Sequence, residues 1–73
     1  MLKRVLLVET VRELWRQGWA ANLEELAELL EWPVDLVLNV ALLCPELILA
    51  GDTDRPDKCY VGINEEREDY KII

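Results

Sequence analysis

The sequence predicts a mainly α domain with a small β-hairpin, and three observations support this. Apolar side chains recur at helical spacing over residues 2–44. Pro33 and Pro45 interrupt that pattern at points where a helix has to begin or end. Two short runs of β-type residues then flank a loop rich in Gly, Pro and Asp. The 73 residues are enough for one such domain and too few for two.

The first helix is expected over residues 2–17. Leu7, Leu14 and Trp15 lie at helical spacing along one apolar stripe. Gly18 follows directly, and glycine commonly occupies the position after a helix end. We therefore expect the helix to stop before Gly18 and to place Trp15 in the core.

The second helix is expected to begin after Asn22. Asn22 is a favourable N-cap, and Glu25, three residues later, completes the pattern of a capping box. Leu26 and Leu30 continue the apolar stripe of this helix. Pro33 ends the helix, because its ring disfavours the α conformation of the residue before it.

A third helix and a hairpin complete the domain. Pro33 suits the first position of a helix, and Pro45 cannot lie in a helix interior. The third helix is therefore expected from Pro33 to about Cys44. The strands of the hairpin are expected at residues 47–50 and 59–63, on either side of the turn-rich loop.

Helix, helix, tight turn, helix and hairpin is an order that resembles a winged helix. The resemblance rests on the run NLEELAELLEWP at residues 22–33 and on apolar residues that follow it: Leu36, Val40, Leu43, Leu47 and Ile48. It implies that the first three of these point to the core. One departure is Glu31 in the turn, where a glycine is common. The resemblance covers roughly residues 3–63, identifies no particular family, and divides the chain into a winged-helix-like domain at 1–63 and a charged C-terminal tail at 64–73.

The charge distribution argues against the DNA binding that the resemblance implies. Helix-turn-helix proteins place their recognition helix, here the third, in the major groove. The net charge is −7, and residues 22–54, which hold the second and third helices, carry eight acidic side chains and no basic one. Such a surface repels phosphates and lacks the arginine that most often reads guanine.

A DNA-binding transcriptional regulator stays as the alternative, because basic side chains lie elsewhere in the chain. The wing loop and the first helix would make the backbone contacts, and one amide on the third helix would read adenine. The candidate residues are Arg55, Lys58, Asn39, Arg12 and Arg16. Arg12 and Arg16, four residues apart, are also expected to pair with neighbouring glutamates.

A protein-interaction module is our first hypothesis, because the third helix is apolar over most of its circumference. Asp35, Asn39 and Glu46 fall into one narrow wedge, and the remaining arc is far wider than the ~100° stripe that a surface helix needs. Either the first helix and the hairpin enclose this arc, or another chain covers part of it, as a homodimer or as a protein partner. Trp19 and Trp32, at helix ends, either cover the core edge or contact that partner. The partner-binding candidates are Val34, Val37, Leu38, Ala41, Leu42, Trp32, Ile72 and Ile73.

No catalytic or metal site is predicted. The chain has no histidine, so the usual general-base arrangements are absent. Asp52, Asp54 and Asp57 resemble the opening of a calcium loop, but Ile63 stands at the twelfth position, where glutamate is required. We expect no cofactor, no small-molecule substrate and no enzymatic activity.

The two cysteines and the lack of a long apolar run predict a cytoplasmic protein without a membrane segment. A hairpin centred on residues 51–58 would place Ala50 near Cys59 and leave Cys44 farther away than the ~7 Å α-carbon spacing that a disulfide tolerates. Two free thiols suit a reducing compartment. The most apolar window, residues 34–51, is too interrupted by polar residues to span a bilayer.

Overall fold

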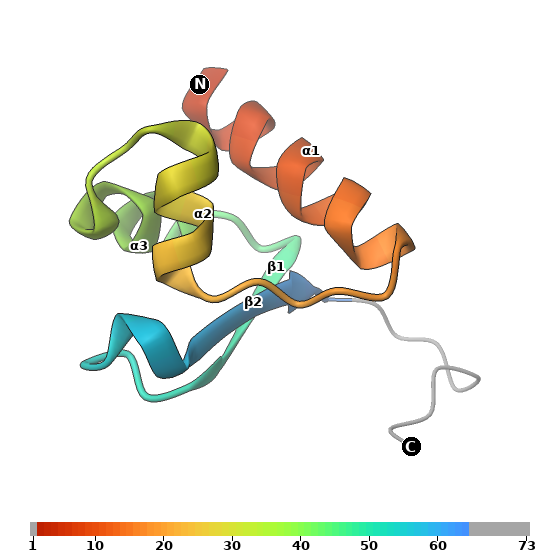
Figure 1. The fold of residues 1–73 in the computed structure, drawn as a ribbon. Helices are drawn as coiled ribbons and strands as arrows, with labels where there is room; N and C mark the ends of the chain where they lie inside the picture. The colour runs from red at the N-terminus through yellow and green to blue at the C-terminus, as the bar shows by residue number, and fades with distance from the viewer. Residues whose placement is uncertain (1, 65–73) are drawn as a thin grey trace.

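A computed structural model describes residues 2–64 and shows a mainly α fold with a small antiparallel hairpin (Figure 1). The elements are α1 (Leu2–Arg16), α2 (Leu23–Leu30), α3 (Val34–Leu42), β1 (Leu47–Gly51), the short 3-10 turn η1 (Pro56–Lys58) and β2 (Cys59–Ile63). The expected fold class is confirmed, and the order of elements is compatible with a winged-helix-like arrangement. Ile72 and Ile73 lie outside the described residues.

The helix ends follow the predicted signals closely, with two small corrections. Helix α1 ends at Arg16, and Gly18, two residues later, has φ +88, which confirms that the helix stops before this glycine. Pro33 is the N-cap of α3 rather than its first residue. Helix α3 ends at Leu42 rather than near Cys44, because the amides of Leu43 and Cys44 bond only three residues back and tighten the chain out of the helix.

The predicted capping box at the start of α2 is confirmed. The Asn22 side chain accepts from the Glu25 amide at 2.8 Å, and the Glu25 carboxylate accepts from the Asn22 amide at 3.1 Å. Asn22 does more than cap the helix, since its side-chain amide donates to the Asp57 carbonyl at 3.2 Å. The Val61 amide also donates to the Ala21 carbonyl at 2.9 Å. The start of α2 is thereby tied to both η1 and β2.

The turn between α2 and α3 explains the departure at Glu31. Glu31 caps the C-terminus of α2 in the left-handed conformation, with φ 58 and ψ 42. The amide of Trp32 donates to the Ala27 carbonyl at 3.0 Å and closes the helix end. Glycine adopts this conformation without steric cost, whereas glutamate is strained in it. Residue 31 therefore adopts the left-handed conformation that glycine usually supplies in such a turn, although the residue here is glutamate.

The core lies between the three helices and one face of the hairpin. Its largest fully buried side chains come from α1, α2, α3 and β2 and are Leu7, Leu23, Leu26, Val11, Val37, Val61 and Cys59. Trp15 is half-buried and packs against this core, and its ring lies so close over Gly62 that a Cβ there would clash. Leu43, which was expected in the core, is exposed, because α3 has ended and the chain turns it outward; Cys44 is buried instead.

The hairpin forms with a register one residue from the expected one. Gly51, rather than Ala50, lies opposite Cys59, and Leu47 lies opposite Ile63. Gly51 has φ +110, and a Cβ there would clash with the Lys58 carbonyl, so the turn requires glycine at this point. Cys44 and Cys59 are both buried free thiols.

Candidate functional site

The exposed face of α2 and α3, which correspond to the helix-turn-helix unit of the resemblance, is acidic and apolar. On α3, Asp35, Asn39 and Leu42 are exposed, and Leu43 and Glu46 continue this surface beyond the helix. Residues 22–54 contain no lysine or arginine that could lie beside them. A duplex placed against α3 would therefore meet a carboxylate, an amide and leucines from a segment that supplies no cation of its own to neutralise phosphates.

The basic residues of the alternative hypothesis are spread over α1 and the wing loop (residues 51–58). Arg55 and Lys58 are exposed, and the loop that carries them packs on α2 through η1. Arg16 pairs with Glu13 at 3.5 Å, as expected for a surface arginine on a helix. Arg12 lines a cleft on another side of α1. Asn39 is exposed on α3.

The wing loop is organised around acidic residues. The Asp52 carboxylate accepts from the Asp54 amide at 2.9 Å, and the Arg55 amide donates to the Asp52 carbonyl at 2.9 Å. The Asp57 carbonyl holds the Asn22 side chain. The three aspartates outnumber Arg55 and Lys58, so the loop presents no net positive charge.

The apolar arc of α3 is mostly core, which corrects part of the proposed partner surface. Val37 and Ala41 are buried and cannot contact a partner without unfolding. Val34, Leu38 and Trp32 are half-buried and pack against the core. Of the helix candidates only Leu42 is exposed. The apolar arc is wide because α1 and the hairpin of the same chain pack against much of it, which is the first of the two arrangements considered above.

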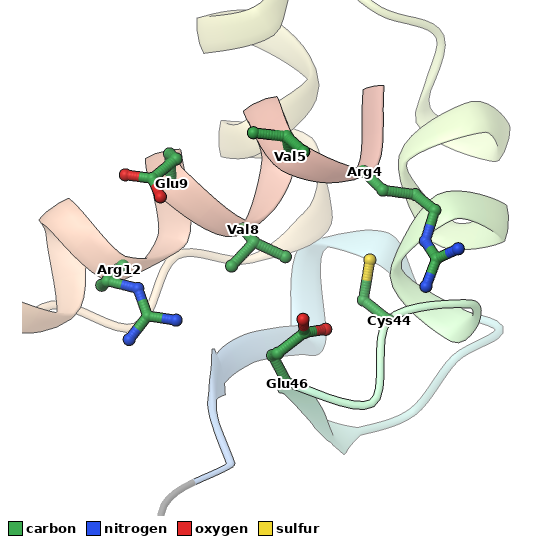
Figure 2. A pocket seen from close by; sticks show the side chains of 7 residues that line it. All are labelled: Arg4, Val5, Val8, Glu9, Arg12, Cys44 and Glu46. Carbon is green, nitrogen blue, oxygen red and sulfur yellow. The ribbon is translucent and has the colours of Figure 1, made fainter. Parts of the chain in front are cut away.

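A cleft of about 320 Å³ separates α1 from the turn that follows α3. Figure 2 shows Arg4 and Arg12 at its two ends, Val8 between them, and Cys44 and Glu46 on the facing turn. Its lining residues are Arg4, Val5, Val8, Glu9, Arg12, Cys44 and Glu46. Two guanidinium groups and two carboxylates line the cleft, so it offers no net charge to an ionic ligand.

A second hollow, of about 290 Å³, lies between α2 and the chain that leaves α1. We call it the Trp19 groove; it is lined by Leu14, Trp19, Ala21, Glu25, Glu28 and Leu29. Trp19 is 64% exposed and Leu29 is 61% exposed, which are high values for large apolar side chains. Two features of the sequence bear on this groove: Trp19 lies outside the helices, and Leu29 lies off the buried stripe of α2.

Exposed apolar side chains are found on each of the three α-helices and on both strands. On α1 they are Leu2, Val5 and Leu6, and on the hairpin Ile48 and Tyr60; the remainder are Trp19, Leu29, Leu42 and Leu43. Such side chains are individually ordinary on a protein surface, but contiguous ones mark interaction sites. The Trp19 groove is where two of them line one hollow.

The Cys59 thiol is chemically quiet. Burial raises the pKa of this thiol, and the negative charge of Asp52 raises it further. The thiolate is the reactive form of cysteine, so Cys59 stays protonated and inert at neutral pH.

Within residues 2–64 no group of three or more His, Cys, Asp or Glu side chains is placed to hold a metal ion. No helix in this part of the chain is long and apolar enough to cross a membrane. Comparisons with protein-family models, with curated proteins and with solved structures give no match to this chain.

Proposed function

We propose that this chain is a winged-helix-like module that binds protein, either a second copy of itself or a partner, and that it does not act by binding nucleic acid or by catalysis. The observation that carries the proposal is the exposed surface of α3. This surface presents Asp35, Asn39 and Leu42, and the whole helix-turn-helix unit lacks a cation.

The physical reason is the source of affinity for DNA. Phosphate neutralisation by lysine and arginine supplies essentially all non-specific binding and a large share of specific binding. In this domain the third helix would bring Asp35 toward the phosphates instead. Exposed apolar side chains on α1 and beside α2 are groups that another protein can bury, whereas the phosphate backbone of a duplex cannot.

The experiment is fluorescence anisotropy of a labelled random duplex titrated with the protein at about 50 mM salt, where charge attraction is strongest. We expect no binding below about 100 μM, which corresponds to the weak end of non-specific association. The double variant Arg55→Gln, Lys58→Gln is the control, because it removes the exposed cations of the wing loop.

Micromolar binding by the wild type that this control abolishes would overturn the proposal. It would support the alternative, a DNA-binding regulator that uses the wing loop and α1. Binding that survives the control but falls when Arg12 and Arg16 are replaced by glutamine would support the α1 version of the same alternative.

A further inference from the structure

We infer that the Trp19 groove binds the first two turns of α1 from a second copy of this chain. The inference rests on the proposed function and names the contact through which the protein associates with itself. Three observations carry it: the shape and lining of the groove, the exposed face of α1, and the opposite charges of the two surfaces.

The groove combines an apolar floor with an acidic side. Trp19 and Leu29 contribute exposed apolar surface, and Glu25 and Glu28 come from α2 on one side. Among residues 2–64, no lysine or arginine lines it. Tryptophan in a concave site is the residue type most enriched where interfaces concentrate their binding energy. The occupant that fits is therefore an apolar side chain accompanied by positive charge.

The start of α1 has this chemistry. Leu2 is 82% exposed and Leu6 is 48% exposed, and their spacing of four residues places them on one face of the helix. Lys3 is exposed beside them. The first turn of α1 contains no acidic residue, so the positive end of the helix dipole is not compensated there. We call Leu2, Lys3 and Leu6 the α1 face.

No other described part of the chain matches the groove as well. The exposed apolar residues of the hairpin, Ile48 and Tyr60, adjoin a wing loop that holds three aspartates against two cations. Leu42 and Leu43 belong to the acidic segment 22–54 and would bring like charge toward Glu28. Among residues 2–64, the α1 face alone combines exposed leucines with the positive charge of Lys3, and the first turn of α1 holds no carboxylate.

The contact joins two different surfaces, and this gives it a specific signature. Leu29→Asp damages the groove and Leu6→Asp damages the α1 face; both residues are exposed, so the fold tolerates the changes. Each variant should weaken self-association at least about tenfold in sedimentation equilibrium over about 10–300 μM. An equimolar mixture of the two should form a one-to-one complex, because one intact groove then meets one intact α1 face.

The matched control is Leu42→Asp, which makes the same chemical change at a leucine of nearly equal exposure, 64%. It should leave the association unchanged. Thermal unfolding followed by circular dichroism checks that all three variants fold. If Leu42→Asp abolishes the association instead, the contact lies at the end of α3 and the inference is overturned.

Charge reversal tests the electrostatic part separately. Lys3→Glu and Glu28→Lys should each weaken association about threefold to tenfold at low salt, and both changes in one chain should restore it. Glu28 is chosen over Glu25, because Glu25 closes the capping box of α2. Wild-type association should also weaken as salt rises from about 50 to about 500 mM.

Two further outcomes overturn the inference. The first is a wild-type protein that stays monomeric at about 300 μM, which does not use this contact. The second is a mixture of Leu6→Asp with Leu29→Asp that stays monomeric, which shows that the Trp19 groove does not bind the α1 face. Neither outcome touches the proposed function, which fails only if the duplex titration shows binding through the wing loop or α1.

Discussion

Two regions are held in the fold by different means: the α2–wing region, which comprises α2, the wing loop and β2, and the helix α3. Helix α2 is anchored at its start by the reciprocal bonds of Asn22 and Glu25, and the same asparagine reaches the Asp57 carbonyl. Helix α3 has no side-chain cap at either end. It is fixed instead by burial of Val37, Val40 and Ala41 between α1, α2 and the hairpin. Local hydrogen bonds at its start therefore place α2, whereas tertiary packing places α3.

The difference explains how the acidic surface is tolerated. Glu24 and Glu25 lie in the first turn of α2, where the helix dipole favours negative charge. Asp35 occupies the equivalent place in α3. These acidic residues thus stabilise the first turns of α2 and α3, even though they disfavour contact with phosphate. The same charges therefore stabilise the fold locally and support the proposal that the module binds protein rather than nucleic acid.

The largest expected effect comes from placing a charge under α3. Val37→Asp buries a carboxylate without a partner, at a cost of about 3–5 kcal/mol, which is comparable to the whole stability of so small a domain. We expect this variant to be unfolded by circular dichroism at 25 °C. Leu42→Asp, five residues later on the exposed side, should change the urea midpoint little. A folded Val37→Asp protein would show that α3 is not held by burial.

Removing the cap should have the next largest effect. Asn22→Ala deletes the acceptor for the Glu25 amide and the donor to the Asp57 carbonyl, so we expect a loss of about 1–2 kcal/mol. Urea unfolding measures it. Asn39→Ala is the control, because Asn39 is exposed in the middle of α3 and should change stability by less than about 0.5 kcal/mol. Equal losses in the two variants would erase the distinction between the regions.

The end of α2 offers a smaller change with the opposite sign. Glu31→Gly relieves the backbone strain of the left-handed conformation and removes a negative charge from a helix C-terminus. We therefore expect the free energy of unfolding to rise by about 1 kcal/mol. Glu28→Gly makes the same substitution inside the helix and should lose about 1 kcal/mol. Thermal unfolding of both proteins gives the signs directly. A destabilised Glu31→Gly would mean that the glutamate side chain contributes more than its backbone costs.

Sequence patterns predicted the features that depend on neighbouring residues. The capping box at Asn22, the helix end at Gly18 and the hairpin all follow from local conformational preferences. The exposure of Leu43, the one-residue shift of register and the burial of Val37 and Ala41 did not follow. The exposure of Leu43 and the burial of Val37 and Ala41 depend on where α3 meets the rest of the chain, and the register depends on the close approach of Gly51 to the Lys58 carbonyl.

The candidate site was harder to predict than the fold. Leu29 and Trp19 are ten residues apart, and nothing local indicates that they line one groove. The width of the apolar arc on α3 could not separate a core from an interface, because a helix enclosed by its own chain and one enclosed by a partner have the same periodicity. The tertiary positions of α1 and the hairpin decide it.

The smallest expected effect concerns the pH dependence of the α2–wing region. Burial, assisted by Asp52, raises the pKa of the Cys59 thiol above its ordinary value of about 8.5. Above that value the unfolded chain releases the thiol proton while the folded chain keeps it, so folding stability falls as pH rises. The contribution is complete below the ordinary thiol pKa and is lost as pH rises from there through the raised pKa of the folded state.

Cys59→Val isolates this contribution, because it replaces a buried thiol by an apolar group of similar size and leaves every other titrating residue in place. The difference in unfolding free energy between wild type and Cys59→Val should be constant from pH 6 to about pH 8 and should then shift against the wild type up to about pH 10. Urea unfolding at each pH provides the measurement, and Asp52→Asn should reduce the shift without abolishing it, since burial is the larger cause. A difference that stays flat to pH 10 would show that the folded protein accommodates the thiolate, so that burial does not raise the pKa of Cys59.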